Sequence, residues 1–341
     1  MASPPAATEA PAPTETPPVR AMTASEQWGF LLFTTWSIVG LFLDGWAHNH
    51  QKPETFFTPW HAILYSGFAI GFAYFAIDGW RASRAGVVRP PVAGLRLTTV
   101  GAVLFVVGMV GDFAWHTAFG IEVGVDALFS PTHLTLMTGG LLLVSAPYRS
   151  ELEMARREGN SERPAGTLPV VISVTMSAAL VGFFLQFISA FRDVVASPTT
   201  ALAGRSGFVE RMMINGVAAV LITNLVVVTA GAFLLRFRLR PGMLTVSFGA
   251  FALMLSGLDS FHRGAIVLAA VLAGLVADGL VHIGREDLAL PIAGGVLWLN
   301  WFALLALTGP MAWNQNVWLG TIYLAVLEAT VISMLAGIKR A

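Results

Sequence analysis

The segments VGLFLDGWAH (residues 39–48) and FTPWHAILYSG (57–67) place acidic and imidazole side chains inside runs that are otherwise apolar. A second pair, VGMVGDFAWH (107–116) and FSPTHLTLMTG (129–139), repeats the arrangement. Of the ten positions that define the pattern, eight are identical and two exchange serine for threonine. Because internal similarity of this kind is the signature of a repeated structural unit, the sequence predicts two copies of one helical hairpin.

The whole chain has the composition of a membrane protein. Its 341 residues are 55% hydrophobic and 12% charged, whereas a soluble domain is about 25% charged. The apolar runs have lengths close to the roughly 20 residues that cross a bilayer as a helix. We therefore expect an all-α, polytopic transmembrane bundle of about ten helices, built from repeated helical hairpins. The expected spans are 28–47, 59–79, 97–117, 132–148, 168–191, 213–235, 241–259, 264–283, 289–308 and 316–338, of which the seventh and eighth could instead form a re-entrant or tilted pair.

Charge and cysteine content exclude several functions. The 20 Lys and Arg residues balance 20 Asp and Glu residues, and no long basic run is present, so nucleic acid is not an expected partner. The expected partners are the lipid bilayer and further membrane subunits. The chain has no cysteine, which excludes thiolate metal sites and leaves histidine and carboxylate as the strong metal ligands.

The distribution of Lys and Arg predicts the orientation, because cytoplasmic loops carry the positive excess. Two expected loops are rich in arginine, and they hold Arg81, Arg84, Arg89 and Arg96, and then Arg149, Arg156, Arg157 and Arg163. Both termini should then be cytoplasmic. The preference for Arg over Lys, with abundant Ala and Gly, favours a bacterial plasma membrane protein. The expected divisions are a disordered cytoplasmic tail (1–25), a duplicated metal-binding half (26–148), a cytoplasmic loop (149–167) and a second membrane half (168–341).

The repeated polar residues have the spacing of a metal site. Asp and His four positions apart lie on one helix face, so Asp44 with His48, and Asp112 with His116, can point at a common ion. Thr58 and Ser130 read as helix N-caps followed by proline, which places His61 and His133 in the first turn of the next helix. The electropositive helix start keeps these imidazoles neutral, the form that binds metal. By the predicted orientation, all of these residues lie near the extracytoplasmic face.

Two histidines and one carboxylate per hairpin form the ligand set of non-haem iron(II) sites, and the same donors suit copper(II), zinc or manganese. An alternative is that each aspartate only pairs with its own histidine as a hydrogen-bonded clip. Duplication of the whole set favours a metal, because clusters of ionisable groups in a membrane are costly and usually functional. The candidate ligands are therefore Asp44, His48, His61, Asp112, His116 and His133.

The spacing of Asp44, His48 and His61, with three and then twelve intervening residues, resembles the metal motif in the C subunit of the copper membrane monooxygenases. That family includes the particulate methane and ammonia monooxygenases. The resemblance covers about twenty residues and implies that these three side chains coordinate copper. The second copy differs, since sixteen residues separate His116 from His133. On this basis copper is the favoured metal, with iron or zinc as alternatives.

Secondary candidates lie in the second half of the chain. Asp259 and His262 are three positions apart, and Asp278 and His282 are four apart near the expected cytoplasmic end. Glu328, like Asn224, falls well inside an expected span, where a functional relay and a simple interhelical hydrogen bond are both open.

Four functions are compatible with these residues. The first is a redox or oxygen-activating metalloprotein with an open coordination position. The second is a transition-metal transporter or metal-supply protein, in which Asn224, Asp278, His282 and Glu328 mark an inward path. A zinc-dependent intramembrane hydrolase and a bis-histidine haem protein rank lower. Whether the protein is an enzyme stays open.

Overall fold

The computed structural model describes residues 19–52, 57–87, 89–120, 124–159, 164–192, 206–262, 264–308 and 311–339. Within these residues the chain forms twelve α-helices and one short 3-10 helix, with two isolated β-bridges. The α-helices are α1 (Ala24–Asn49), α2 (Pro59–Arg84), α3 (Leu95–Phe119), α4 (Asp126–Phe129), α5 (Pro131–Val144), α6 (Ala146–Arg157), α7 (Leu168–Phe184), α8 (Ser206–Leu234), α9 (Met243–Gly257), α10 (Ala265–His282), α11 (Glu286–Thr308) and α12 (Gln315–Leu335). The 3-10 helix, η1 (Gln186–Ile188), follows α7.

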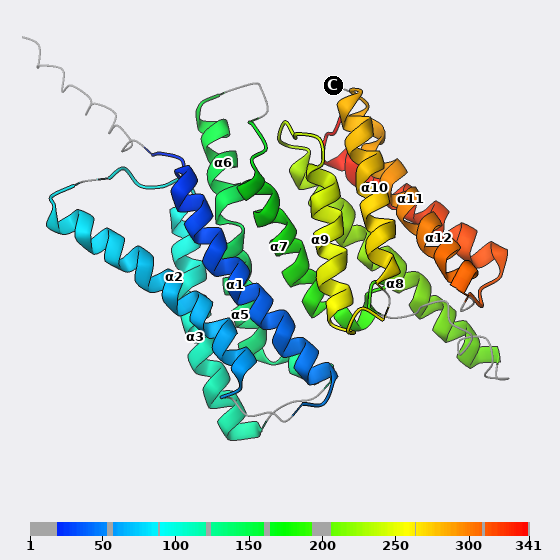
Figure 1. Cartoon of the computed structure of the whole chain (residues 1–341), viewed down its shortest axis with the longest axis horizontal. Helices are drawn as coiled ribbons and strands as arrows, with labels where there is room; N and C mark the ends of the chain where they lie inside the picture. Colours follow the sequence, from blue (N-terminus) through cyan, green and yellow to red (C-terminus); the bar gives the residue numbers. More distant parts are fainter. Residues whose placement is uncertain are drawn as a thin grey trace, which may run out of the picture.

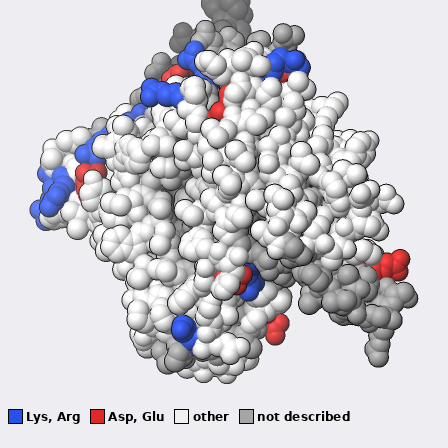
Figure 2. All heavy atoms as spheres, turned by 45° about the vertical axis from the view of Figure 1, so that its right-hand side comes forward, with Lys and Arg blue, Asp and Glu red and all other residues white. Residues whose placement is uncertain are grey.

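Each of the ten predicted apolar runs coincides with one of these helices. Seven are long and apolar enough to cross a membrane, namely α1, α2, α3, α8, α10, α11 and α12. The other three, α5, α7 and α9, are apolar but shorter. The chain is thus an all-helical, multi-pass membrane protein by the length and composition of its helices. The visible face in Figure 2 agrees with this, since a wide uncharged belt separates most of its Lys and Arg residues from the opposite end.

The first helix begins earlier than the predicted tail allows. Thr23 caps α1 and forms a capping box with Glu26, and Arg20 pairs with Glu26 at 2.7 Å. The last residues of the expected tail thus contact the start of α1, where the cap and the ion pair satisfy free groups of the helix. The rest of the predicted tail, residues 1–18, lies outside the described residues.

The predicted loop 149–167 is also partly helical. Its first residues belong to α6, which packs over the start of α1: the Met22 backbone N–H donates to the Ser150 hydroxyl at 3.0 Å, and the Gln27 amide donates to Glu151 at 2.5 Å. The polar residues that suggested a loop instead belong to an amphipathic helix on the surface of the bundle.

Helices α1 and α2 form one hairpin and α3 and α5 form another, each held by glycines at matching positions. A Cβ atom on Gly40 would lie 2.4 Å from the Leu64 backbone nitrogen, and one on Gly108 would lie 2.8 Å from the Leu136 side chain. The partner glycines show the same closeness: a Cβ on Gly67 or on Gly139 would also meet the facing helix at under 3 Å. Only a hydrogen fits at these crossings, which is how small residues let membrane helices approach closely.

The second half continues the bundle. Helices α9 to α12 pack in sequence against one another, and α8 packs against α12 and α7. In Figure 1 the green helix α7 lies between the blue and teal hairpins and the yellow to red helices, and it contacts α1 and α5 on one side and α9 on the other. The largest cluster of buried apolar side chains is centred on α7 and the second half.

Candidate metal centre

Asp112, His116 and His133 form a compact group at one end of the second hairpin. Asp112 and His116 lie one turn apart near the end of α3, and His133 lies in the first turn of α5. The Asp112 Oδ1 atom is 3.4 Å from His116 Nε2 and 2.9 Å from His133 Nε2. One ligand atom of each residue lies within 4.8 Å of the other two, and Asp112 is only 1% exposed. This is a group of three side chains that could hold a metal ion.

The backbone fixes both imidazoles of this group. The Ser130 hydroxyl caps α5 as predicted and accepts from the His133 backbone N–H at 3.2 Å. The His133 Nδ1 atom faces the Ala127 carbonyl oxygen, and His116 Nδ1 faces the Gly120 carbonyl oxygen at 3.2 Å. A carbonyl only accepts, so each Nδ1 carries the proton and donates it. This is the arrangement by which metal-ligating histidines are oriented, with the other nitrogen left for the metal.

With the protons on Nδ1, electron-rich atoms face one another at Asp112. In a neutral imidazole with a protonated Nδ1, the Nε2 lone pair points outward, and here two such atoms face one carboxylate oxygen. Lone pairs and a carboxylate repel unless a cation lies between them. That cation is either a proton on each ring, which makes two imidazolium groups 5.5 Å apart, or one metal ion that all three residues share.

Asp44, His48 and His61 lie at the matching positions of the first hairpin, but among the described residues only Asp112, His116 and His133 bring one ligand atom each within 4.8 Å of the others. Asp44 Oδ2 is 3.6 Å from His48 Nε2, and Asp44 Oδ1 is 3.5 Å from His61 Nε2. Thr58 caps α2 as predicted, and its hydroxyl lies 3.1 Å from His61 Nδ1. The buried Asp44 Oδ1 has no hydrogen-bond partner among the described residues. Such an atom is costly to bury, so a cation or a ligand donor at this point would stabilise it.

The distances distinguish a coordination geometry from a set of hydrogen bonds. With metal bonds of about 2.0–2.2 Å in a tetrahedral site, two ligand atoms lie about 3.4 Å apart. Three of the four carboxylate-to-imidazole distances are 3.4–3.6 Å, which is longer than an ordinary hydrogen bond. The fourth, His133 to Asp112 at 2.9 Å, has hydrogen-bond length. A simple hydrogen bond between aspartate and histidine therefore explains the position of His133 better than the positions of the other three histidines.

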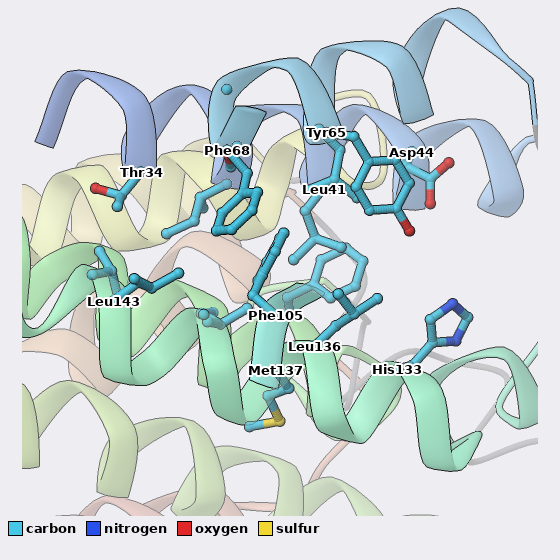
Figure 3. Close-up of a pocket in the computed structure, with 18 of the residues that line it drawn as sticks. Thr34, Leu41, Asp44, Tyr65, Phe68, Phe105, His133, Leu136, Met137 and Leu143 are labelled. Carbon is cyan, nitrogen blue, oxygen red and sulfur yellow. The ribbon is translucent and has the colours of Figure 1, made fainter. Parts of the chain in front are cut away.

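Tyr65 on α2 links the two groups. Its hydroxyl donates to Asp112 Oδ2 at 2.9 Å, and its ring stacks on His61 with the ring centroids 6.1 Å apart. Residues of both groups line one cavity, and Figure 3 shows Asp44, Tyr65 and His133 together at one end of it. The repeat pattern did not indicate Tyr65, because methionine, Met137, stands at the matching position of the second hairpin. A tyrosine one turn after His61 in an apolar helix was the available signal.

We expect Tyr65→Phe to weaken metal binding by about 10–100-fold, the usual cost of removing a hydrogen bond to a metal-ligating side chain. The ring and its packing remain, so the fold should be kept. Tyr74→Phe is the matched control, because Tyr74 lies on the same helix and is 53% exposed. Metal titration of the two purified variants measures the difference; equal affinities would show that the Tyr65 hydroxyl does not orient Asp112.

Asp259 and His262 do not join either group. Their closest side-chain atoms are 4.0 Å apart, both side chains are exposed, and His262 Nδ1 lies 2.6 Å from the Asp259 carbonyl oxygen. The turn that carries them packs against the end of α1, where Trp46 Nε1 donates to the Ser260 hydroxyl at 2.9 Å. This turn supports the first hairpin from outside the metal centre.

Asp278 has a structural role at the start of α9. Its carboxylate accepts from the backbone N–H groups of Leu244 and Thr245, at 3.2 and 2.9 Å, and from the Thr245 hydroxyl at 2.6 Å. It thereby satisfies helix N–H groups that have no partner inside α9. His282 is exposed at the end of α10, so the four-residue spacing of this pair does not produce a ligand set.

We expect Asp278→Ala to lower the free energy of unfolding by about 1–3 kcal/mol, because it leaves buried backbone donors unsatisfied. Metal content should not change. His282→Ala is the control and should leave both quantities at the wild-type value. Denaturant unfolding measures the stability of both variants, and metal analysis of the same samples measures the bound metal. Loss of metal from Asp278→Ala with unchanged stability would contradict the structural role of Asp278.

Glu328 belongs to an interhelical network in the second half. The fully buried Asn224 of α8 donates to Glu328 Oε2 at 2.7 Å and to the Ala325 carbonyl at 3.0 Å, and it accepts from Trp298 Nε1 at 3.0 Å. These bonds join α8, α11 and α12. Of the two interpretations of Glu328, the interhelical hydrogen bond is the one that these contacts describe.

The chain matches no protein-family model, no curated protein and no solved structure. What the fold and site define is therefore a class: a helical multi-pass membrane protein with a buried histidine and aspartate group able to hold a metal. The likeness to the C subunit of the copper membrane monooxygenases stays a prediction that rests on the spacing of Asp44, His48 and His61.

Proposed function

We propose that this protein is a membrane metalloprotein that binds a transition metal through Asp112, His116 and His133, with Asp44, His48 and His61 as a second ligand set. The observation that carries the proposal is the pair of Nε2 atoms turned toward Asp112 while backbone carbonyls hold the Nδ1 protons. One metal ion satisfies the three residues together, whereas two neighbouring imidazolium groups would repel each other.

Copper is the favoured metal. Histidine nitrogen and carboxylate oxygen bind copper(II), iron(II) and zinc, so the donor set alone admits all three. The motif spacing that resembles the copper membrane monooxygenases favours copper. Three protein ligands leave coordination positions open, and an open position on a redox metal supports oxygen activation or electron transfer.

The architecture proposed around this centre follows the predicted topology. The two hairpins are copies of one unit, which is supported by the matching glycine crossings and by the similar distances within the pairs Asp44–His48 and Asp112–His116. All ten apolar helices cross the bacterial plasma membrane, the shorter three included, with both termini cytoplasmic. The metal groups then lie toward the extracytoplasmic side, at the end of the hairpins opposite the arginine-rich connections.

Metal transport or supply is the second candidate. It is favoured by the cavity, whose lining extends along α1 from the ligand groups to Glu26. Uptake of copper into vesicles that contain the protein would support this function. In that case the variant Glu26→Gln should reduce uptake without changing the amount of metal bound at rest.

Elemental analysis tests the metal proposal. The full chain is purified, exposed to copper, iron or zinc, freed of excess ion and analysed beside the double variant His61→Ala/His133→Ala. We expect bound metal in the wild type and at most a trace in the double variant, because each ligand set has lost one imidazole. Equal metal in both proteins, or none in either, would refute the proposal.

A further inference from the structure

A large cavity lies between the two hairpins, and residues of the metal centre line one end of it. Its volume is about 1070 Å³, at the upper end of the range of about 300–1,000 Å³ for small-molecule pockets. Both Glu26 and His48 of α1 line it, and at 1.5 Å per residue these two are about 33 Å apart along the helix. That length is close to the roughly 30 Å hydrocarbon core of a bilayer. The cavity is thus elongated and follows the direction of the spans.

The walls of the cavity between its two ends are mainly apolar. Phe68 of α2 and Phe105 of α3 stack with their ring centroids 4.5 Å apart, and Figure 3 shows them with Leu41, Leu136 and Leu143 along the cavity. A wall made mainly of phenylalanine and leucine side chains favours hydrocarbon over a polar solute, with a few hydroxyl side chains such as Thr34 and Ser37 among them. Along this part of its length, the cavity suits an alkyl chain.

The cavity also reaches the surface that faces lipid. Phe72 of α2 and Leu95 of α3 both line it and are 58% and 47% exposed. Helix α2 packs on α1, and in Figure 1 its C-terminal end diverges from the rest of the bundle. A molecule dissolved in the membrane can therefore enter sideways between the hairpins, without passing through water.

The metal end of the cavity selects the head of such a molecule. Asp44 and Asp112 both line this end, so in the metal-free protein an anionic head would meet two carboxylates. Asp44 Oδ1 lies 3.5 Å from His61 Nε2 but accepts no hydrogen bond among the described residues, so it can take one from a bound donor. A hydroxyl group is uncharged and can donate its proton to this oxygen. It also keeps lone pairs for a neighbouring metal. Two cations, Lys52 and Arg192, also line the cavity, but each lies over an aromatic ring.

We propose that the cavity binds a membrane-borne long-chain alcohol, with its hydrocarbon chain between Phe68 and Leu136 and its hydroxyl at Asp44 beside the metal centre. This ligand class deepens the proposed function, since it places an oxidisable or transferable head group beside the bound metal. The binding of the chain itself depends on the cavity walls and not on the metal.

Photolabelling tests the proposal. The full chain in lipid nanodiscs is irradiated with a sixteen-carbon alcohol that carries a mid-chain diazirine, and the adducts are mapped by mass spectrometry. We expect adducts on the cavity faces of α2, α3 and α5. Ala102→Phe, which fills the cavity from α3, should reduce labelling by at least about tenfold, the effect of a 1.4 kcal/mol loss of affinity. Val103→Phe is the matched control on the adjacent, 57% exposed residue and should label as the wild type does.

A second filling variant and a second probe make the outcome decisive. Thr34→Phe, on the α1 wall, should reduce labelling as Ala102→Phe does, and circular dichroism of each variant reports whether it is folded. In the metal-free protein, an alkyl phosphate with the same chain should label less than the alcohol; stronger labelling by the phosphate would overturn the hydroxyl assignment in favour of Lys52 and Arg192. Adducts spread over lipid-facing positions, unchanged by either filling variant, would overturn the binding site.

The same samples separate this inference from the proposed function. Bound metal without cavity labelling would refute the alcohol site and leave the metal centre standing. Cavity labelling in a protein that binds no metal would refute the metal centre and leave a lipid site.

Discussion

Replacing Asp112 with asparagine is expected to weaken metal binding by at least about 100-fold, more than the 10–100-fold effect of residues that only support a ligand. Asparagine keeps the shape of the side chain and an oxygen that accepts the Tyr65 hydrogen bond. It removes the charge that makes a carboxylate a strong metal ligand. The substitution thus distinguishes a coordinating aspartate from one that only accepts hydrogen bonds.

Asp259→Asn is the control for this variant, because Asp259 also stands beside a histidine but lies outside the cluster. Its metal affinity should equal that of the wild type. Competition titration with a chromophoric chelator measures both variants, and circular dichroism verifies that they are helical. If Asp112→Asn binds metal as tightly as Asp259→Asn, Asp112 is a hydrogen-bonded clip and not a ligand.

The second large effect is expected from Gly40→Ala at the crossing of α1 and α2. The added Cβ would lie 2.4 Å from a backbone nitrogen, which cannot turn aside as a side chain can. The helices must separate, and overpacking of this kind costs about 1–3 kcal/mol. Gly40 lies one turn before Asp44, so the separation also draws Asp44 away from His61 and lowers the metal affinity of the first group.

Gly79→Ala provides the matched comparison. Gly79 lies on α2, and a Cβ added there meets nothing within 4 Å, so the substitution should leave stability unchanged or raise it by up to about 1 kcal/mol through helix propensity. Unfolding of both variants in mixed detergent micelles gives the difference. Equal stability of Gly40→Ala and Gly79→Ala would show that the hairpin tolerates a wider crossing.

Features set by local sequence were accessible without a structure. The caps at Thr58 and Ser130 were predicted and are present, because a cap depends on residues within one helical turn. The ten apolar helices were predicted for the same reason, since each run carries its own signal. The pairing of Asp112 with His116 follows from their spacing on one helix.

Features that depend on helix packing were not accessible in this way. Asp278 and His282 have the same spacing as Asp112 and His116, yet Asp278 caps α9 because α10 lies against it. Tyr65 reaches Asp112 only because α2 packs beside α3, and the spacing of residues along the sequence does not predict which helices pack together. The helix α6 was assigned to a loop because its polar surface resembles one, while its contacts with Gln27 and Met22 come from distant parts of the chain.

X-ray absorption spectroscopy of the metal-loaded full chain tests the central claim most directly, because it reports the atoms bound to the ion. The account predicts two imidazole nitrogens and one carboxylate oxygen for each ion, at about 2.0–2.2 Å, with the imidazole scattering reduced in His133→Ala and unchanged in His262→Ala. A spectrum without imidazole scattering, or one that His133→Ala does not change, would contradict it.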